Sequence, residues 1–280
     1  MTERPVRTEM PNQIELSVVN RFRREIWTKF LKGIKEYELI QAGDKIAVCI
    51  SGGKDSMLMA MCMKRLQRYS KIPFEVVFLV MNPGYNEINY QKIRENAELL
   101  EIPVQVFETG IFDAVAKVDQ HPCYLCARMR RGHLYKTARE LGCNKIALGH
   151  HFDDVIETIL MAMLWGGQLQ GMMPKLRSRS HPGMEVIRPL YMVHEQNIIA
   201  WAEANGLSFI QCACRVTQKS GGSKRQEVKE LLARLNLEND KVEKNVFNAI
   251  HTLQPDSFPG WRAHGVAHSF LEWYDGEERT

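Results

Sequence analysis

The 280-residue chain lacks any long apolar run, and its first residues carry no apolar segment. The longest apolar stretch, residues 156–165, is far shorter than the roughly 20 residues that span a bilayer. The opening sequence MTERPVRTEM is polar and has no apolar centre of the kind found in signal peptides. We therefore expect no membrane association and a cytoplasmic protein.

A disulfide framework is also not expected, because the seven cysteines are odd in number and a cytosolic protein keeps its thiols reduced. Cys49, Cys62 and Cys143 lie within or beside apolar runs, which predicts buried packing residues. The remaining cysteines form a CxxC pair and a CxC pair, a spacing that indicates a metal centre. These four are Cys123, Cys126, Cys212 and Cys214.

The chain has no strong charge of either sign. Its net charge is +4, and a composition of 45% hydrophobic and 25% charged residues is typical of a globular protein. The length fits one large domain with appendages. We expect a basic helical extension over residues 1–42, a main domain over 43–215, and a helical extension with a tail over 216–280.

Short β-rich runs alternate with helical periods through the main domain. This alternation predicts an α/β fold, a parallel sheet with helices on both faces. The expected strands are residues 45–50, 74–80, 103–108, 144–149, 185–190 and 207–211, and the expected helices 54–69, 87–100, 126–141, 153–165 and 194–205. Residues 12–40 are expected to form an amphipathic basic helix and residues 223–252 two charged helices, while the tail from Pro255 has no assignment.

The segment SGGKDS follows the first expected strand and opens a helix. Its glycines allow the backbone to approach an anion, and the helix adds its N-terminal partial charge. The loop also contains a lysine, which can neutralise phosphate charge, and two serines, whose hydroxyl groups can donate hydrogen bonds. The segment resembles the PP-loop of ATP pyrophosphatases, which cleave ATP between the α- and β-phosphates; an ordinary glycine-rich junction is the alternative. The expected ATP-binding residues are Ser51, Gly52, Gly53, Lys54, Asp55 and Ser56.

A second segment, GHHFDD, lies at another strand-to-helix junction and so at the same edge of the sheet. Its two carboxylates, Asp153 and Asp154, are suited to Mg²⁺ bound to a triphosphate. The alternative for Asp153 is a cap of the following helix. Gly149 and His150 are expected near ATP, although both histidines of the segment are equally consistent with a structural role.

The spacing of the cysteines leaves redox, zinc and iron–sulfur uses open. However, CYLCARMRRGHLYKTARELGCNKIALGHHFDD, followed by GGQLQGMMPKL and VIRPL, resembles the tRNA 2-thiocytidine synthetases over about residues 40–212. The resemblance implies a [4Fe-4S] cluster on Cys123, Cys126 and Cys212, with one iron left open for sulfur. That family usually has another cysteine three positions beyond the third ligand; here Cys214 is only two beyond, so it is the alternative ligand.

Basic residues gather on the expected helix beside the CxxC pair, which favours binding of an RNA backbone over a solvated helix face. The expected tRNA-binding residues are Arg128, Arg130, Arg131 and Lys136, with His133 and Arg139 on the same helix.

The resemblance implies an ATP-dependent tRNA sulfur-transferase that adenylates O2 of a cytidine, at position 32 of the tRNA, and replaces it by sulfur. Lys54 and Asp154 are the expected catalytic residues, and a sulfur donor such as a cysteine desulfurase is an expected partner. The alternatives are a 2-thiouridine thiolase, a PP-loop ligase or amidotransferase, and a zinc-stabilised module that binds nucleotide or RNA without thiolation. The absence of a second CxxC disfavours the thiouridine branch, and a homodimer is left open.

Overall fold

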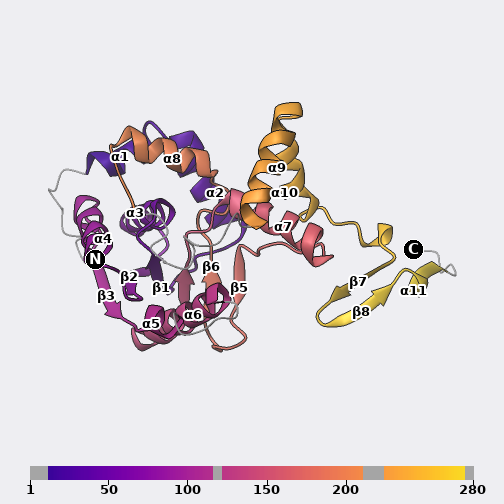
Figure 1. Cartoon of the computed structure of the whole chain (residues 1–280), viewed down its shortest axis with the longest axis horizontal. Helices are drawn as coiled ribbons and strands as arrows, with labels where there is room; N and C mark the ends of the chain where they lie inside the picture. Colours follow the sequence, from indigo (N-terminus) through magenta and orange to yellow (C-terminus); the bar gives the residue numbers. More distant parts are fainter. Residues whose placement is uncertain (1–11, 116–121, 211–223, 275–280) are drawn as a thin grey trace. The chain divides into compact units, whose positions relative to one another are not determined.

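The computed structural model describes residues 12–115, 122–210 and 224–274 (Figure 1). The chain divides into two units. Unit 1 comprises residues 1–155 and 172–223, and unit 2 residues 156–171 and 224–280. Among the described residues, every helix is too short or too polar to cross a membrane.

A six-stranded sheet forms the centre of unit 1. Its strands are in the order β3-β2-β1-β4-β6-β5, and every neighbouring pair is parallel except β5 with β6. The bounds are β1 Lys45–Ile50, β2 Glu75–Asn82, β3 Val104–Glu108, β4 Lys145–Ala147, β5 Lys175–Arg177 and β6 Glu185–Ile187. The predicted α/β class, a parallel sheet covered by helices, is therefore confirmed.

One face of the sheet is covered by most of the helices of unit 1 (Figure 1). Residues 56–63 of α3 are all buried, because this helix lies between the sheet and further helices and has no solvent face there. Trp201 of α8 and Phe30 of α2 close the same core. The bounds are α1 Gln13–Val19, η1 Arg23–Trp27, α2 Thr28–Glu36, α3 Lys54–Tyr69, α4 Glu87–Leu99 and α8 Glu195–Ala204.

The opposite face is covered by α5 (Ile111–Val115) and α6 (Pro122–Glu140). Tyr135 and Ala138 of α6 are buried against Ile146 of β4 and Val186 of β6. Since α6 follows β3 and precedes β4, it runs from the carboxyl ends of the parallel strands back to their amino ends. This direction places its CxxC half near the edge of the sheet that carries the glycine loop.

The prediction of one uninterrupted helix over residues 12–40 is wrong. The segment consists of α1, a π-helical turn η1 and α2. Its buried apolar residues, Val18, Phe22, Ile26 and Phe30, recur every fourth position, whereas an α-helix would rotate such a row by about 40° at each repeat. Wider turns, with Phe22 N–H bonded to Ser17 O and Trp27 N–H to Phe22 O, keep the row on the core.

Two strand predictions also need correction. Residues 207–210 form no strand, although their apolar pattern suggested one. They cross the core irregularly: Phe209 stacks near Trp201, and Ser208 O accepts a hydrogen bond from Asn96 Nδ2 at 2.9 Å instead of from a neighbouring strand. Strand β5, with the sequence KLR, was not predicted because it is short and mostly polar.

Unit 2 contains the C-terminal part of α7 (Phe152–Gly166), which begins in unit 1, and the two predicted charged helices, α9 (Lys224–Glu238) and α10 (Val242–Ala249). Glu157 of α7 is buried and paired with Arg225 at 3.2 Å and Lys229 at 3.6 Å. The tail forms a short helix, a hairpin and a last helical turn: η2 Pro255–Ser257, β7 Gly260–Ala263, β8 Val266–Ser269 and α11 Leu271–Tyr274.

Candidate functional site

The glycine loop joins the end of β1 to the start of α3 and is held by its own side chains. Ser56 Oγ donates to Gly53 O at 2.9 Å and accepts from Ser51 N–H at 3.1 Å. Gly52 has a φ of +87°, and a Cβ on it would lie 2.5 Å from Ile93 Cγ1. A side chain is therefore excluded at Gly52 both by the positive φ and by the clash with Ile93, and the backbone here can take the tight turn that an anion-binding loop requires.

Gly149, just beyond β4, packs directly on this loop. A Cβ on Gly149 would lie 3.1 Å from both the N and the Cα of Ser56, so a larger residue would push the two strand ends apart. This close approach brings the segment from His150 to Asp154 against the first turn of α3. The structure thus places both predicted ATP motifs at one corner, the carboxyl edge of β1 and β4.

His151 is the centre of that corner. Its side chain is 5% exposed, with Nε2 3.8 Å from Asp55 Oδ1 and 3.4 Å from Asp154 Oδ2. Its Nδ1 lies 3.5 Å from Asp153 Oδ2. His150, the neighbouring histidine, is half-buried. The sequence did not distinguish the two histidines, and the structure brings His151 within 4 Å of the surrounding carboxylates.

Glu195, the first residue of α8, belongs to the same corner and was not predicted. Its Oε1 accepts a hydrogen bond from Lys54 Nζ at 2.8 Å, and its backbone N–H donates to Asp153 Oδ2 at 2.7 Å. Asp153 therefore caps α8 rather than its own helix, while Asp154 Oδ2 accepts the His151 N–H at 3.1 Å, at the start of α7. The sequence position of Glu195 could have indicated this role, because Glu195 opens the helix that follows β6, the next parallel strand after β4.

The pKa values of these groups reflect burial opposed by close partners. Burial lowers the pKa of Lys54, but the hydrogen bond to Glu195 and the charge of Asp55 outweigh burial and hold this pKa above its usual value. Burial raises the pKa of Asp55, and His151 and Lys54 offset only part of that rise.

Burial and close partners also act in opposite directions on the pKa values of His151 and Asp153. Burial lowers the pKa of His151, but Asp153, Asp154 and Asp55 together outweigh burial and raise this pKa. Burial raises the pKa of Asp153, yet the contact with His151 and the N–H of Glu195 reverse the direction and lower this pKa. The corner thus favours an ionised Asp153 beside a charged Lys54 and a protonated His151.

Carboxylates outnumber basic groups at this corner. The acidic side chains are Asp55, Asp153, Asp154 and Glu195, and the basic ones are Lys54 and His151. A polyphosphate would meet net repulsion here unless a cation accompanied it. Within the described ranges, no group of three or more His, Cys, Asp or Glu is arranged to hold a metal by itself.

The predicted cluster ligands are described only in part. Cys126 lies on α6, half-buried against the small cluster of Met81, Ile111 and Val115. Cys123 belongs to the first turn of α6, but its side chain lies outside the described residues, as do Cys212 and Cys214. The three cysteines predicted to be packing residues are buried, which confirms that prediction, and burial raises the pKa of the Cys49 thiol to about 12.

The predicted tRNA-binding residues all lie on α6. Arg128, Arg131 and Lys136 are exposed, and Arg130 is half-buried. Arg131 Nε donates to Ala127 O at 3.3 Å on its own helix, and Lys136 lies 4.0 Å from Glu140. Arg130 lies on the side of the helix opposite to Arg128, whereas Arg131 and Lys136 flank Arg128 at about 60° and 80° of rotation, so three of the four residues share one broad face.

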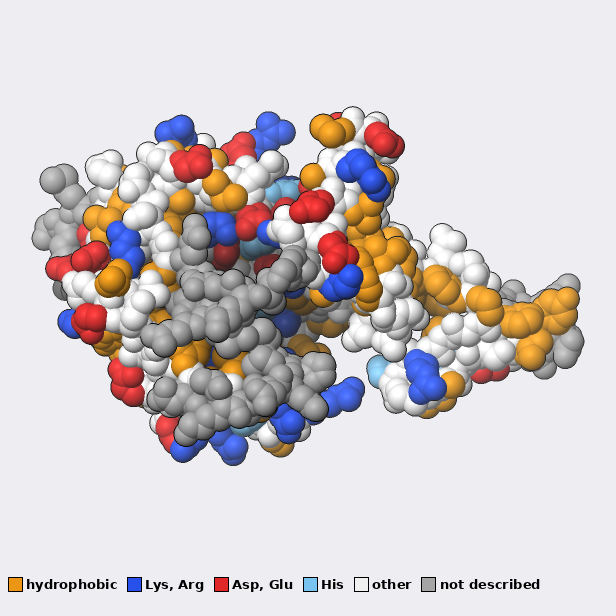
Figure 2. Space-filling model, viewed as in Figure 1, with side chains coloured by type: hydrophobic (Ala, Val, Ile, Leu, Met, Phe, Trp, Pro, Cys, Tyr) orange, Lys and Arg blue, Asp and Glu red, His pale blue; other side chains and the backbone are white. Residues whose placement is uncertain are grey.

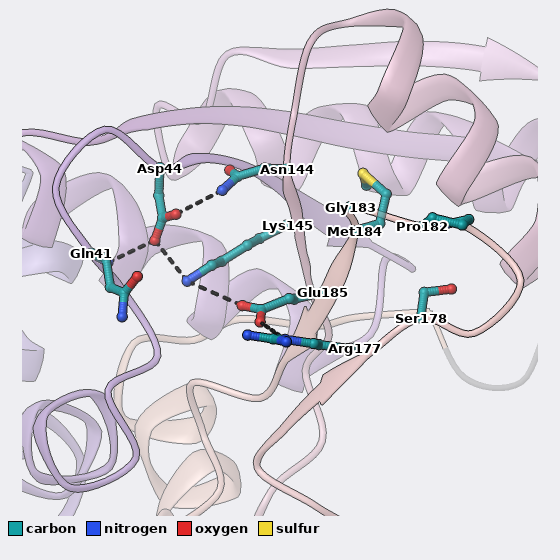
Figure 3. Close-up of a pocket in the computed structure, with 10 residues that line it drawn as sticks. All are labelled: Gln41, Asp44, Asn144, Lys145, Arg177, Ser178, Pro182, Gly183, Met184 and Glu185. Atoms are coloured by element: carbon teal, nitrogen blue, oxygen red, sulfur yellow. Dashed lines mark hydrogen bonds and ion pairs between the residues drawn. The ribbon is translucent and has the colours of Figure 1, made fainter.

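A cavity of about 510 Å³ lies elsewhere, at the amino ends of β4 and β6 (Figure 3). Its central charge, Lys145, is buried between Asp44 at 2.8 Å and Glu185 at 3.4 Å. Lys145 Nζ also donates to Leu39 O at 3.0 Å, and Asp44 accepts from Asn144 Nδ2 at 2.8 Å. Because the buried charges of this cavity are already paired with one another, we assign them a structural role. Ligands of parallel sheets also bind at the opposite edge, beyond the carboxyl ends of the strands.

Comparison with known proteins agrees with the motifs. The family model of the PP-loop domain matches residues 23–256. The tRNA-cytidine(32) 2-sulfurtransferase of Syntrophotalea carbinolica is 37% identical over 243 residues, covering 85% of this chain and 92% of that protein. The protein of the same name from Anaeromyxobacter sp. (strain K) is 33% identical over 240 residues, covering 85% of this chain and 81% of its own length.

Among solved structures, the U34-tRNA thiolase NcsA from Methanococcus maripaludis, determined with its [4Fe-4S] cluster, has a similar fold. The TM-score is 0.62 at 20% sequence identity, and the match covers 81% of this chain and 79% of that one. At this identity the likeness establishes the fold and leaves the chemistry to the residues.

Proposed function

The chain belongs to the PP-loop family of the tRNA-cytidine(32) 2-sulfurtransferases, and from this premise we propose that it uses ATP to replace O2 of a tRNA cytidine by sulfur. The observation that carries the proposal is the convergence at one edge of the sheet. A glycine loop after β1, two carboxylates after β4 and a lysine–glutamate pair reaching α8 meet within hydrogen-bond or ion-pair distance.

ATP fits this corner through its phosphates. The loop residues Gly52 and Gly53 would bind them with backbone N–H groups, aided by the N-terminus of α3. Lys54, held by Glu195 in the structure, would turn its ammonium group toward the phosphates and neutralise part of their charge. The excess of carboxylates supports Mg²⁺ as the accompanying cation, bound by Asp154 or Asp153 together with phosphate oxygens, since Mg²⁺ is commonly held by one or two carboxylates plus substrate phosphates.

The reaction has two steps. The cytidine O2 attacks the α-phosphorus of ATP, the bond from that phosphorus to the oxygen bridging to the β-phosphate breaks, and pyrophosphate leaves with both electrons. Sulfur then attacks C2, and the C2–O bond breaks to release AMP, which carries the former O2. Lys54 would act in the first step by stabilising the charge that develops on the phosphates, which is the main contribution expected of such a group, and Mg²⁺ held by Asp154 or Asp153 would supply further positive charge there.

The sulfur site is proposed on the cysteines. A [4Fe-4S] cluster held by Cys123, Cys126 and Cys212 would supply an open iron for the incoming sulfur. A sulfur donor such as a cysteine desulfurase would reload the site after each turnover. NcsA, whose fold is similar, was determined with a [4Fe-4S] cluster, and this chain has its CxxC pair at the start of α6, the end of the helix nearer the ATP corner.

Nucleoside mass spectrometry tests the proposal. Unmodified tRNA is incubated with the anaerobically prepared protein, ATP, Mg²⁺ and sulfide, digested, and examined for 2-thiocytidine. We expect 2-thiocytidine with ATP and none without it. Formation of 2-thiouridine instead would assign the chain to another base, and unmodified nucleosides throughout would reject the function.

Metal analysis separates the enzyme from a zinc-stabilised binding module. Iron with acid-labile sulfide supports the cluster, whereas zinc alone supports the module.

For the third ligand we expect that Cys212→Ala loses the iron–sulfur absorption and the thiolation, while Cys214→Ala keeps the absorption and at least partial activity. Loss of absorption in the Cys214 variant alone would move the ligand to Cys214. Loss in both variants would point to a fully ligated cluster and reject the open iron.

A further inference from the structure

One face of α6 carries basic side chains along most of the helix. Arg128, Lys136 and Arg139 follow one another at spacings of eight and three residues, which keeps them within about 80° of arc. All three are exposed. Between Arg128 and Arg139 the helix advances by about 16 Å, so the stripe is long enough to follow a polyanion over several charges. Arg131 borders the stripe at about 60° from Arg128, whereas Arg130 points to the opposite side and does not belong to it.

Gly132 lies in the middle of this stripe, and the fold gives no reason for a glycine there. Its φ is not positive, and a Cβ would meet no atom within 4 Å. A glycine inside a helix is less stable than an alanine, because its backbone loses more freedom on folding. Gly132 thus costs the helix stability and leaves an empty space between basic side chains. Such a glycine is expected where another backbone approaches the helix closely.

A hollow of about 610 Å³ opens above Gly132. It is lined by Gly132, Lys136, Arg139, Glu140 and His181. The ring of His181 stacks on Tyr135 with centroids 4.5 Å apart and an interplanar angle of 11°, and its Nδ1 lies 3.0 Å from Ser180 Oγ. One wall of the hollow is therefore a ring fixed by stacking, and the other is formed by two flexible basic side chains.

The surroundings of the hollow remain basic. Figure 2 shows Lys and Arg side chains along the lower margin of the view, where Figure 1 draws α6 and the loop between β5 and β6. Arg177, the last residue of β5, and Arg179 in the loop are exposed. Glu140 and Glu185 are the nearby acids, paired with Lys136 at 4.0 Å and Arg177 at 3.4 Å. The surface thus keeps a positive excess from Arg128, Arg139 and Arg179.

We infer that this hollow binds the sugar–phosphate backbone of the RNA substrate, in a base-paired stem rather than at the reacting base. The inference rests on the proposed function. The C-terminal half of α6 lies toward the amino edge of the sheet, away from the ATP corner. The lining offers positive charge and open space, and its one aromatic ring, His181, is held in place by stacking on Tyr135. Such a surface suits phosphates and shape, which is how double-stranded RNA is recognised.

Two variants test charge and space separately. Arg139→Glu reverses one charge of the stripe, and Gly132→Leu fills the hollow without changing charge, with a residue that helices accept well. The matched control is Lys71→Glu, an equal charge change at an exposed lysine before β2. Unmodified tRNA is titrated against each protein at several salt concentrations, and thiolation is followed at varied tRNA.

For Arg139→Glu we expect a loss of affinity of about tenfold at low salt, and a salt dependence shallower by roughly one counterion. Gly132→Leu should lose affinity with the wild-type salt slope nearly retained, since no charge is removed. In both variants the KM for tRNA should rise while kcat and ATP binding stay near wild type. The control should match wild type throughout.

Wild-type affinity and salt slope in both hollow variants would overturn the inference, and so would equal losses in the Lys71 control. A loss of binding to a sulfur-donor protein, with tRNA affinity unchanged, would reassign the surface to that partner. The two proposals can fail separately. If the wild type thiolates tRNA and both hollow variants bind tRNA as the wild type does, only the role of the hollow is rejected. If the hollow variants lose tRNA affinity as expected but the wild type does not thiolate tRNA, only the proposed chemistry is rejected.

Discussion

The central sheet has a lysine paired with carboxylates at each of its two edges. Lys145 at the amino edge lies 2.8 Å from Asp44, and Lys54 at the carboxyl edge lies 2.8 Å from Glu195. The two pairs have the same length, but their surroundings differ. The side chain of Lys145 is 3% exposed, whereas that of Lys54 is 26% exposed and its partner Glu195 is 22% exposed.

The difference shows that an ion pair alone does not identify a site. Lys145 also donates to Leu39 O and contacts Glu185, so its ammonium group has its hydrogen-bonding capacity satisfied inside the protein. Lys54 shares its carboxylates with His151, beside a loop built from glycine backbone. The first arrangement links the N-terminal segment to the sheet, and the second leaves the Lys54 charge partly exposed, as its proposed role at the phosphates requires.

The largest expected effect comes from breaking the amino-edge pair. Lys145→Met should lower the free energy of unfolding by roughly 3–5 kcal/mol, because Asp44 would be left buried without its cation. Urea unfolding followed by circular dichroism measures this change. Lys71→Met, at an exposed position, serves as the control and should stay within about 0.5 kcal/mol of wild type. A Lys145 variant as stable as the control would contradict the structural role.

Breaking the carboxyl-edge pair should instead reduce activity. Lys54→Ala should lower ATP-dependent thiolation by roughly 10² or more, as for loss of a comparable electrostatic group, while the melting temperature and the iron–sulfur absorption stay near wild type. Single-turnover thiolation with saturating tRNA checks the rate. Near-normal thiolation in this variant would remove Lys54 and its loop from the reaction.

A milder change sharpens the comparison. Glu195→Gln keeps the hydrogen bond from the backbone N–H of residue 195 to Asp153, but it removes the negative charge that holds Lys54. We expect kcat/KM for ATP to fall by about tenfold or less, close to the value of one charge-assisted hydrogen bond, with unchanged stability. A change in melting temperature as large as that of Lys145→Met would show that Glu195 supports the fold rather than the position of Lys54.

The smallest expected effect is on the pH dependence of stability. Burial raises the pKa of Asp44, but hydrogen bonds from Lys145 and Asn144 outweigh burial and lower this pKa. The stabilisation is therefore present above the unfolded pKa of about 3.9 and is lost as the pH falls through the lower folded value. Asp44→Asn should flatten the unfolding free energy between about pH 5 and pH 3, relative to wild type. Equal slopes would exclude Asp44 as a source of acid sensitivity.

Local sequence determined the elements and the motifs. The strand of apolar residues before Ser51, the glycines that follow it, and the helical period from Lys54 all act over a few residues, so they predicted β1, the loop and α3 together. The second motif at Gly149 followed from the same reasoning. The two corrected helix and strand assignments, over residues 12–40 and 207–210, arose where packing on the core overrode the local pattern.

Only the tertiary structure decided which side chains meet. Lys54 and Glu195 are 141 positions apart, and no local periodicity relates them. Their contact depends on the order of β1, β4 and β6 in the sheet, which sets α8 beside the glycine loop. The contact of His151 with Asp55 has the same origin, because it needs the chain after β4 to lie beside the start of α3, as the close packing of Gly149 on Ser56 allows.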